Sequence, residues 1–71
     1  MKIQVKIGNR IKEIRDKEKL TQAELAKKSK LNRTFIIHVE KGRRNLSVQS
    51  LESILKGLKI PFNKFFKKDI F

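Results

Sequence analysis

The segment from Thr21 to Gly42 constrains the fold of this 71-residue chain more than any other. Thr21 is a favourable residue immediately before a helix, and Glu24, three positions later, completes the pattern of a capping box. Asn32 is a favourable cap for a second short helix, and Gly42 suits the left-handed backbone that often follows a helix end. The segment therefore predicts two short helices joined by a tight turn. The helices would span about 22–29 and about 33–41, with the turn at residues 30–32.

The isoleucines before this pair predict a first helix. Ile7, Ile11 and Ile14 recur at helical intervals, with charged residues between them. This periodicity is typical of an amphipathic helix, which would run from about Ile7 to Glu18. Residues 3–5 either extend its apolar face or form a short extended arm.

Two further helices are predicted in the last third of the chain. Ser47 is a favourable cap for a helix over about 48–58. Pro61 suits the first position of a last helix, over about 61–70, because its nitrogen carries no hydrogen. Since no segment has a convincing strand pattern, we expect one all-α domain of five helices over residues 1–71. Its second and third helices would form a helix-turn-helix. The fourth helix would turn Leu51, Ile54, Leu55 and Leu58 inward.

The charge balance narrows the class of partner. The chain carries 19 Lys and Arg against 7 Asp and Glu, a formal net charge of +12. Such an excess favours a polyanion through counterion release, and double-stranded DNA is the polyanion that a helix-turn-helix binds. The alternative is a protein that is merely basic and soluble.

The composition also excludes several classes of function. The chain has no cysteine, which rules out disulfides and thiolate metal sites and fits a cytoplasmic protein. The single histidine has no evident partner ligands, so we expect no metal and no cofactor. Without a nucleophile–base pair or paired carboxylates, an enzyme is not expected. No apolar run approaches the length of a membrane span, and capped helices with a shared core argue against a membrane-surface peptide.

The predicted third helix has two chemically different sides. At about 100° per residue, five of its residues fall within an arc of about 140°. The opposite arc is mostly apolar, so it should face the core and leave the first arc exposed. An exposed helix face with hydrogen-bond donors fits the major groove of DNA. The outer arc holds Arg33, Thr34, Ile37, His38 and Lys41, and the inner arc holds Phe35, Ile36, Val39 and Glu40.

Four residues of the outer arc are expected to read bases. Arg33 would form bidentate hydrogen bonds to O6 and N7 of a guanine. Thr34 would bond to a base or a phosphate, or present its methyl group to thymine, and His38 would donate to a base or a phosphate. Ile37 either contacts a thymine methyl group or is half-buried against the preceding helix. The alternative for Arg33 and His38 is a solvated side chain, which for His38 would also be a cation near a helix C-terminus.

A second group of residues is expected to contact phosphates without reading sequence. At the N-terminus of the second helix, free N–H groups and the helix dipole favour a phosphate oxygen. The basic loop after the third helix adds positive charge directly behind the candidate reading residues. The group consists of Gln22, Lys41, Arg43, Arg44 and Asn45.

Apolar residues concentrate at the end of the chain, where four of the five phenylalanines lie. They exceed what a short final helix can bury against its own small domain, which predicts a homodimer interface. The alternative is a closed monomer core with a frayed end. A two-fold dimer would present two reading helices about 34–36 Å apart, so its operator would be palindromic. The predicted interface residues are Phe62, Phe65, Phe66 and Ile70.

The stretch from Ile7 to Ile60 resembles the helix-turn-helix domains of the Cro and phage-repressor superfamily. Within that superfamily, LNRTFIIHVEKGRRNLSVQSLESILKGLKI looks most like the controller proteins of restriction-modification systems. Residues that match Arg33, Thr34 and His38 read bases in these relatives. The superfamily pattern is carried, in register, by Arg15, Gln22, Ala26, Leu31, Ile36, Val39, Glu40 and Gly42.

The resemblance implies a function for the whole chain. Controller proteins are small homodimers that bind palindromic operators upstream of their own gene and of the endonuclease gene. They activate transcription at one occupancy and repress it at a higher one, and activation would add RNA polymerase as a partner. A phage-type repressor or an antitoxin-like autoregulator is the alternative.

The resemblance also implies two structural features. Arg15 and Glu40 match a semi-buried ion pair that ties the first helix to the third. Relatives often place glycine at the end of the first helix and in the turn, where this chain has Lys19 and Lys30. Left-handed backbone costs a residue other than glycine on the order of 1 kcal/mol, so strain is expected at both lysines.

Overall fold

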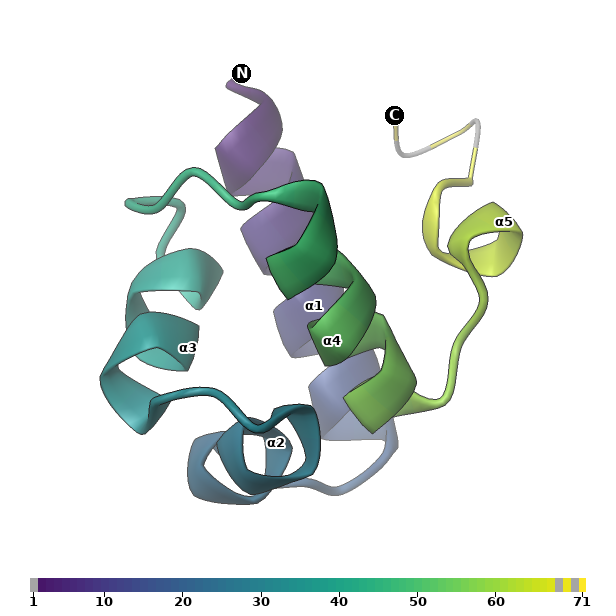
Figure 1. Ribbon diagram of the computed structural model, residues 1–71. Helices are drawn as coiled ribbons and strands as arrows, with labels where there is room; N and C mark the ends of the chain where they lie inside the picture. Colours follow the sequence, from purple (N-terminus) through teal and green to yellow (C-terminus); the bar gives the residue numbers. More distant parts are fainter. Residues whose placement is uncertain (1, 68, 70) are drawn as a thin grey trace.

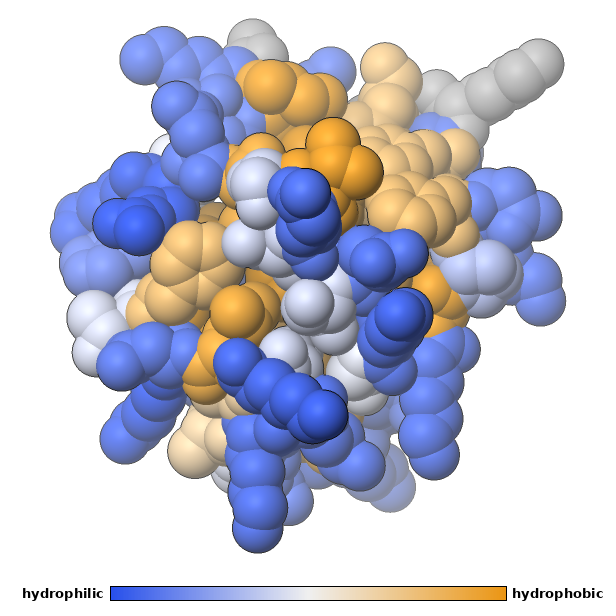
Figure 2. Space-filling model, in the orientation of Figure 1, coloured by the Kyte–Doolittle hydropathy of each residue, from blue (hydrophilic) through white to orange (hydrophobic). Residues whose placement is uncertain are grey.

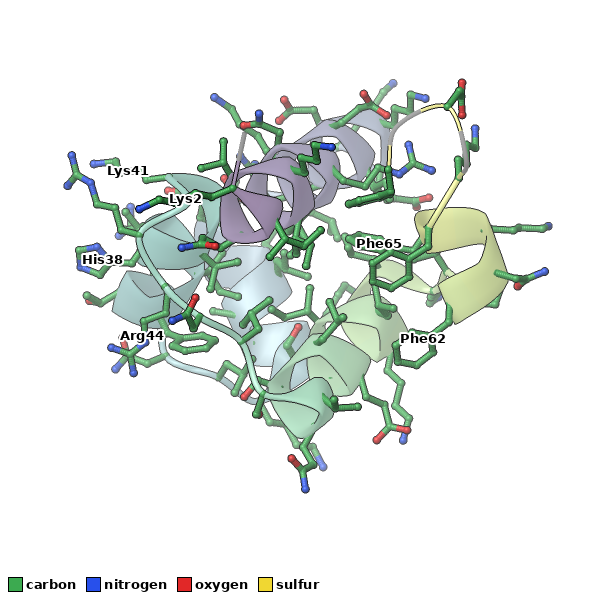
Figure 3. All side chains as sticks on the ribbon, turned by 90° about the horizontal axis from the view of Figure 1, so that it is seen from above. Lys2, His38, Lys41, Arg44, Phe62 and Phe65 are labelled. Atoms are coloured by element: carbon green, nitrogen blue, oxygen red, sulfur yellow. The ribbon has the colours of Figure 1, made fainter. Side chains whose placement is uncertain are left out.

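The computed structural model describes residues 2–67, 69 and 71, and within that part of the chain it contains five helices and no strand. The short helix α2 packs against both α3 and α4, and α3 packs against α1. Figures 1 and 3 place α5 on the opposite side of the molecule from α3. The helices are α1 (Ile3–Lys17), α2 (Gln22–Ser29), α3 (Arg33–Glu40), α4 (Val48–Leu58) and α5 (Phe62–Phe65).

The predicted all-α class is confirmed, and the bounds of α2 and α4 agree with the prediction. Helix α1 begins at Ile3, so residues 3–5 extend the helix and do not form an arm. Helix α5 is much shorter than the predicted 61–70, and that prediction was wrong in length. Pro61 is its N-cap, and Phe66 leaves the helical backbone region at φ −92° and ψ 78°. Of the four residues in α5, only Phe65 is buried. Short helices depend on buried packing for their stability, and so little buried surface cannot stabilise a longer helix here.

Capping groups explain where α2 and α3 begin. The Thr21 hydroxyl accepts from the Glu24 N–H at 3.0 Å, and the Thr21 N–H donates to the Glu24 carboxylate at 2.8 Å. These bonds to Thr21 lower the pKa of Glu24. The capping box therefore stabilises the fold fully above the ordinary glutamate pKa, and the contribution disappears as pH falls through the lowered value. Asn32 accepts from the Thr34 N–H at 2.7 Å and starts α3.

The core lies where the inward faces of all five helices meet. Side chains that are almost fully buried include Ile11 of α1, Leu25 of α2, Ile36 of α3 and Ile54 of α4. On α2, Ala23 is exposed, whereas Leu25 and Ala26 are buried. No helix in the part of the chain described here is long and apolar enough to cross a membrane.

The expected left-handed backbone at Lys19 and Lys30 is confirmed, with φ of 57° and 56°, and Lys59 adds a third such residue at 57°. At Lys30 the geometry ends α2, because the N–H groups of Lys30 and Leu31 donate to the carbonyls of Lys27 and Ala26. Each position thus holds a side chain where the backbone favours glycine.

Lys30→Gly should therefore raise the melting temperature or leave it unchanged. Removing the Cβ relieves on the order of 1 kcal/mol of strain, while the added freedom of the unfolded chain offsets part of that gain. Lys28→Gly is the matched control, since Lys28 is an exposed residue inside the same helix. Glycine in a helix interior should lower the free energy of unfolding by about 1 kcal/mol. Calorimetry compares the two, and a clear drop for Lys30→Gly would contradict the strain at this turn.

Candidate nucleic-acid interface

Helix α3 presents the predicted polar side outward. Ile36 and Val39 are buried in the core, whereas Arg33 and Thr34 are exposed. His38 is half-buried at the same surface. Figure 3 shows His38, Lys41 and Arg44 projecting from one side of the molecule, away from the helix bundle. The predicted division of α3 into an inner and an outer arc is confirmed, and the roles of the outer residues toward DNA remain predictions.

Ile37 is the apolar member of this outer face. It is half-buried, and it is not among the partly buried hydrophobic side chains that pack against the core. Part of its side chain is therefore available to a ligand that approaches Thr34 and His38. Contact of Ile37 with a thymine methyl group remains a prediction.

The loop after α3 begins with a closed helix end. Gly42 adopts φ +72°, and its N–H donates to the Val39 carbonyl at 3.0 Å. The Arg43 N–H donates to the His38 carbonyl at 3.0 Å, which completes a Schellman motif. A Cβ at Gly42 would lie 2.8 Å from a methyl carbon of Val5, so α1 also leaves little room for a side chain here.

Arg44 has a defined position on this loop. Its guanidinium carbon lies 5.1 Å from the centre of the Phe35 ring, a cation–π arrangement. Phe35 is half-buried at the base of α3, so the stack holds Arg44 close to Thr34 and His38. A shallow hollow lined by Asn32, Thr34, Phe35, His38 and Arg44 lies between them. Sequence reasoning missed this stack because the two partners are nine residues apart and belong to different elements.

Lys2 is a further basic residue that sequence reasoning missed. It is the exposed N-cap residue of α1, and Figure 3 labels it next to Lys41. It reaches this surface because α1 starts four residues earlier than predicted and Val5 packs against Gly42. The position of Lys2 would have been predictable only if the first helix had been extended to Ile3.

A buried ion pair supports α3 from behind. The Arg15 Nε and Nη2 atoms donate to the two carboxylate oxygens of Glu40, at 2.6 and 3.0 Å. The Arg15 Nη1 atom donates to the Leu20 carbonyl at 2.8 Å. Hydrogen bonding to Glu40 raises the pKa of Arg15, so the guanidinium keeps its positive charge at physiological pH. The ion pair expected from the family resemblance is therefore present.

Gln22 joins the same network, which sequence reasoning did not foresee. Its side-chain amide nitrogen donates to the Glu40 carboxylate at 3.1 Å. One amide hydrogen is thus directed inward, and the second remains for a ligand at the N-terminus of α2. Glu40 holds both Arg15 of α1 and Gln22 of α2, so a single carboxylate sets the position of α3 relative to both helices.

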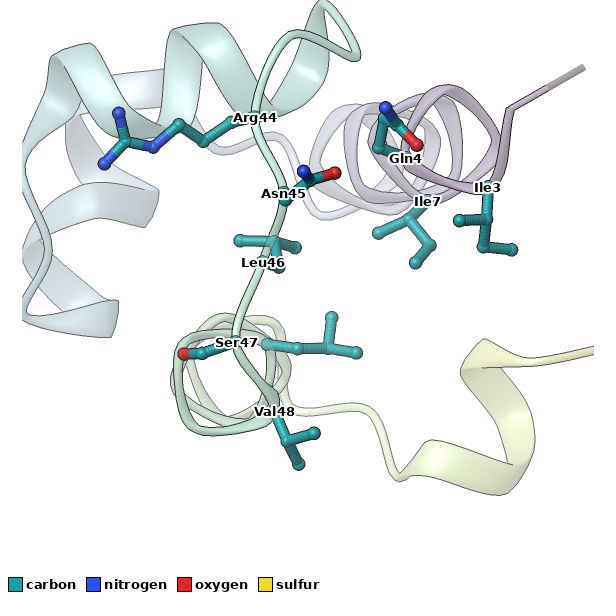
Figure 4. Close-up of a pocket in the computed structure, with 9 residues that line it drawn as sticks. Ile3, Gln4, Ile7, Arg44, Asn45, Leu46, Ser47 and Val48 are labelled. Atoms are coloured by element: carbon teal, nitrogen blue, oxygen red, sulfur yellow. The ribbon is translucent and has the colours of Figure 1, made fainter.

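An exposed apolar surface lies on another face of the molecule. Ile3 is 56% exposed, Val48 76%, Phe62 42% and Phe66 37%. Figure 2 shows apolar side chains gathered on this face, surrounded by hydrophilic ones. A hollow lies between the start of α1, the loop 44–47 and the start of α4 (Figure 4). Besides the loop, its lining consists of Ile3, Gln4, Ile7, Val48 and Leu51. The exposure of Val48 could not be predicted from sequence spacing. Val48 lies three residues before Leu51, so it falls on the apolar stripe that was expected to face the core.

The predicted interface residues differ in how exposed they are. Phe62 and Phe66 are stacked, with ring centroids 6.4 Å apart, and both are partly exposed. Phe65 has no exposed surface and belongs to the chain's own core, so its assignment to a dimer interface was wrong. It packs edge-on against Phe66 at a centroid distance of 4.9 Å. Ile70 lies outside the described residues.

Comparison with known proteins identifies relatives over most of the chain. The helix-turn-helix family matches residues 11–65. Control protein C.MunI of Mycoplasma sp is 37% identical over 65 residues, which cover 90% of this chain and 88% of that protein. The immunity repressor protein of Bacillus phage phi105 is 43% identical over 54 residues. That match covers 76% of this chain and 38% of the repressor, so the chain spans well under half of its length.

A solved structure extends the likeness to three dimensions. The restriction-modification controller protein C.Esp1396I, as a tetramer in complex with its natural 35-base-pair operator, superposes with a TM-score of 0.86. The two chains are 44% identical, and the match covers 89% of this chain and 83% of that chain. The similarity therefore includes nearly the whole of both folds.

Proposed function

Because the chain belongs to the helix-turn-helix family, and within it to the controller proteins of restriction-modification systems, we propose that it is a sequence-specific transcriptional regulator. It binds a palindromic operator as a homodimer and activates or represses its own gene and the endonuclease gene. The observation that carries the proposal is the outward polar face of α3, followed at once by a basic loop.

We assign base reading to the exposed residues of α3. Arg33, at the start of the helix, would reach a guanine edge with two parallel donors. Thr34 and His38 offer a hydroxyl and an imidazole on the same face, and Ile37 adds an apolar surface suited to a thymine methyl group. One face of a helix thus combines polar and apolar readout over two turns.

The residues around this face serve to position the duplex. Gln22 would bring its free amide hydrogen and the N-terminus of α2 to a phosphate. Lys41, Arg43 and Asn45 are exposed beside α3, and Arg44 is held there by Phe35. Contacts of this kind fix register on the DNA and do not distinguish sequences.

The dimer is proposed to form through the exposed apolar surface. Phe62 and Phe66 are available for a partner copy, and Val48 and Ile3 extend the surface across α4 and α1. Ile70, which sequence reasoning also assigned to the interface, stays a candidate. An isologous contact of this surface would place two copies of α3 about 34–36 Å apart.

Three broader proposals accompany this function. Residues 1–71 form one domain, since all five helices contribute to one core. The protein acts by binding and carries out no chemical step, and no group of three metal-ligating side chains occurs among the residues described. Its place of action is the cytoplasm, where operator DNA and RNA polymerase are found.

Selection of bound fragments from random duplex DNA tests the function directly. The expected result is an enriched palindrome with half-sites about one helical turn apart. Recovery of no preferred sequence, or of an asymmetric single site, would contradict a sequence-specific homodimer.

The similarity to the phage repressor makes an immunity-type repressor the second candidate function. A transcription assay on the selected operator distinguishes a controller protein from such a repressor, because a pure repressor would never raise transcription at low occupancy.

Arg33→Ala should weaken binding to the selected operator by about 1–3 kcal/mol and relax the preference at one base position. The guanidinium is exposed in the free protein, so folding should be unaffected. Fluorescence anisotropy on the operator and on single-base variants measures both effects.

Arg43→Ala is the matched control for that experiment. It removes the same charge from the exposed loop, so it should weaken all sequences about equally and leave the base preference unchanged. If Arg33→Ala behaved in the same way as Arg43→Ala, the assignment of Arg33 to base reading would be lost.

A further inference from the structure

Arg10 is a buried charged residue that the DNA-binding proposal does not use. It is 5% exposed on the inner side of α1. Its Nε atom donates to the Phe65 carbonyl at 3.1 Å, and its Nη2 atom donates to the Lys64 carbonyl at 3.0 Å. Its Nη1 atom pairs with the Glu13 carboxylate. The guanidinium therefore spans from α1 to the backbone of α5.

The two carbonyls belong to the last turn of α5, where helices leave acceptors unsatisfied. Arg10 supplies donors to both, and its positive charge lies at the negative end of the helix dipole. A helix of four residues is not stable on its own, so its orientation depends on what holds it. Among the hydrogen bonds of the described residues, those of Arg10 are the ones that join α5 to another helix.

The same helix α1 also touches α3 at two points. Its Gly8 lies so close that a Cβ would be 2.2 Å from the Val39 carbonyl oxygen. Its Arg15 pairs with Glu40. Helix α1 is thus attached to the base-reading helix at residues 8 and 15 and, between them, to α5 at residue 10.

We propose that Arg10 is a positioning residue for operator recognition. It holds α5, which carries Phe62 and leads into Phe66, at a fixed orientation to α1, and through α1 to α3. The dimer contact and the reading helices are thereby rigidly related, which sets the separation of the two copies of α3. This inference rests on the proposed function, since it assigns Arg10 a role in the homodimer that binds the operator.

The geometry requires arginine in particular. Nε and Nη2 lie on one edge of the planar guanidinium and reach two adjacent carbonyls at once. A lysine ammonium is a point charge on a flexible stem and cannot reproduce that two-point contact. Arg10→Lys keeps the charge and loses the fixed geometry, whereas Arg10→Met keeps the apolar stem and loses both.

The test compares Arg10→Met and Arg10→Lys with Lys12→Met, which removes an exposed charge from the same helix. Circular dichroism checks folding, and sedimentation equilibrium without DNA gives the dimer dissociation constant. Binding is then measured to the palindrome recovered by selection and to a duplex that carries one half-site. The ratio of these two affinities reports dimer geometry, which a general loss of fold would not change selectively.

Arg10→Met is expected to raise the dimer dissociation constant about tenfold or more, because two charge-assisted hydrogen bonds to α5 are lost. The palindrome-to-half-site ratio should fall by a similar factor, while half-site affinity stays within about twofold. Arg10→Lys should show the same pattern, and Lys12→Met should match the unmodified chain. An unchanged dissociation constant, an equal loss on both duplexes, or unfolding of both Arg10 variants would overturn the proposal. Failure of the unmodified chain to bind DNA would instead refute the proposed function, because dimerisation is measured separately.

Discussion

Replacing Glu40 with leucine is expected to lower the free energy of unfolding by about 3–5 kcal/mol. The substitution leaves the Arg15 guanidinium buried without the carboxylate that accepts two of its hydrogen bonds. It also removes the acceptor of the Gln22 amide. Small domains are stable by only about 5–15 kcal/mol, so the variant should be partly unfolded near body temperature. Denaturant titration followed by circular dichroism measures the effect.

A double-mutant cycle separates the ion pair from the packing around it. Arg15→Met alone should be similarly destabilising, because it leaves the Glu40 carboxylate buried without its charged partner. The variant with both substitutions should be much more stable than the sum of the single losses predicts, since no uncompensated charge remains. Additive losses would show that each side chain acts through packing alone.

The double variant also addresses why the pair is there. An apolar pair can hold α1 against α3, but it gives Gln22 no acceptor and so leaves the N-terminus of α2 without its link to α3. We expect the double variant to fold and to bind the operator more weakly. The ion pair would then serve the arrangement of the two helices of the helix-turn-helix more than it serves stability.

Local chemistry explains which parts of the fold were predictable from the sequence. Thr21 with Glu24, Asn32 and Ser47 each cap a helix with their own side chains, so the starts of α2, α3 and α4 are encoded within a few residues. The inward side of α3 follows from its apolar spacing in the same way. These features need no knowledge of distant parts of the chain.

Features that depend on distant partners were not predictable from local sequence patterns, and the Arg15–Glu40 pair was expected only through the family resemblance. Arg10 meets carbonyls 54 and 55 residues away, and nothing in its neighbourhood distinguishes it from the exposed Lys12. The sequence likewise cannot say which phenylalanine enters the core, because α5 is too short for its periodicity to be read. Phe65 is taken into the core and Phe66, its neighbour, is left at the surface. The candidate DNA-contacting face was predictable, whereas the hydrogen bond from Gln22 to Glu40 behind it and the attachment of α5 by Arg10 were not.

Phe66→Asp is expected to convert the dimer to a monomer. Phe66 is 37% exposed and packs against the rings of Phe62, Phe65 and Phe71. In a dimer built on this surface the substitution would bury a carboxylate in an apolar contact. The dimer dissociation constant should then rise about a hundredfold or more, since burying an unpaired charge costs several kcal/mol. Sedimentation equilibrium measures the constant.

Asn63→Asp is the matched control, because it adds the same negative charge at an exposed position of α5, three residues before Phe66. It should leave dimerisation within about twofold, as expected for an isolated surface charge. Operator affinity should follow the dimer, because a monomer contacts one half-site and loses the gain from linking two binding events. Phe66→Asp is therefore expected to bind a single half-site almost normally and the palindrome poorly. Unchanged sedimentation, with palindrome affinity intact, would place the interface elsewhere and leave Phe62 and Phe66 as an exposed patch.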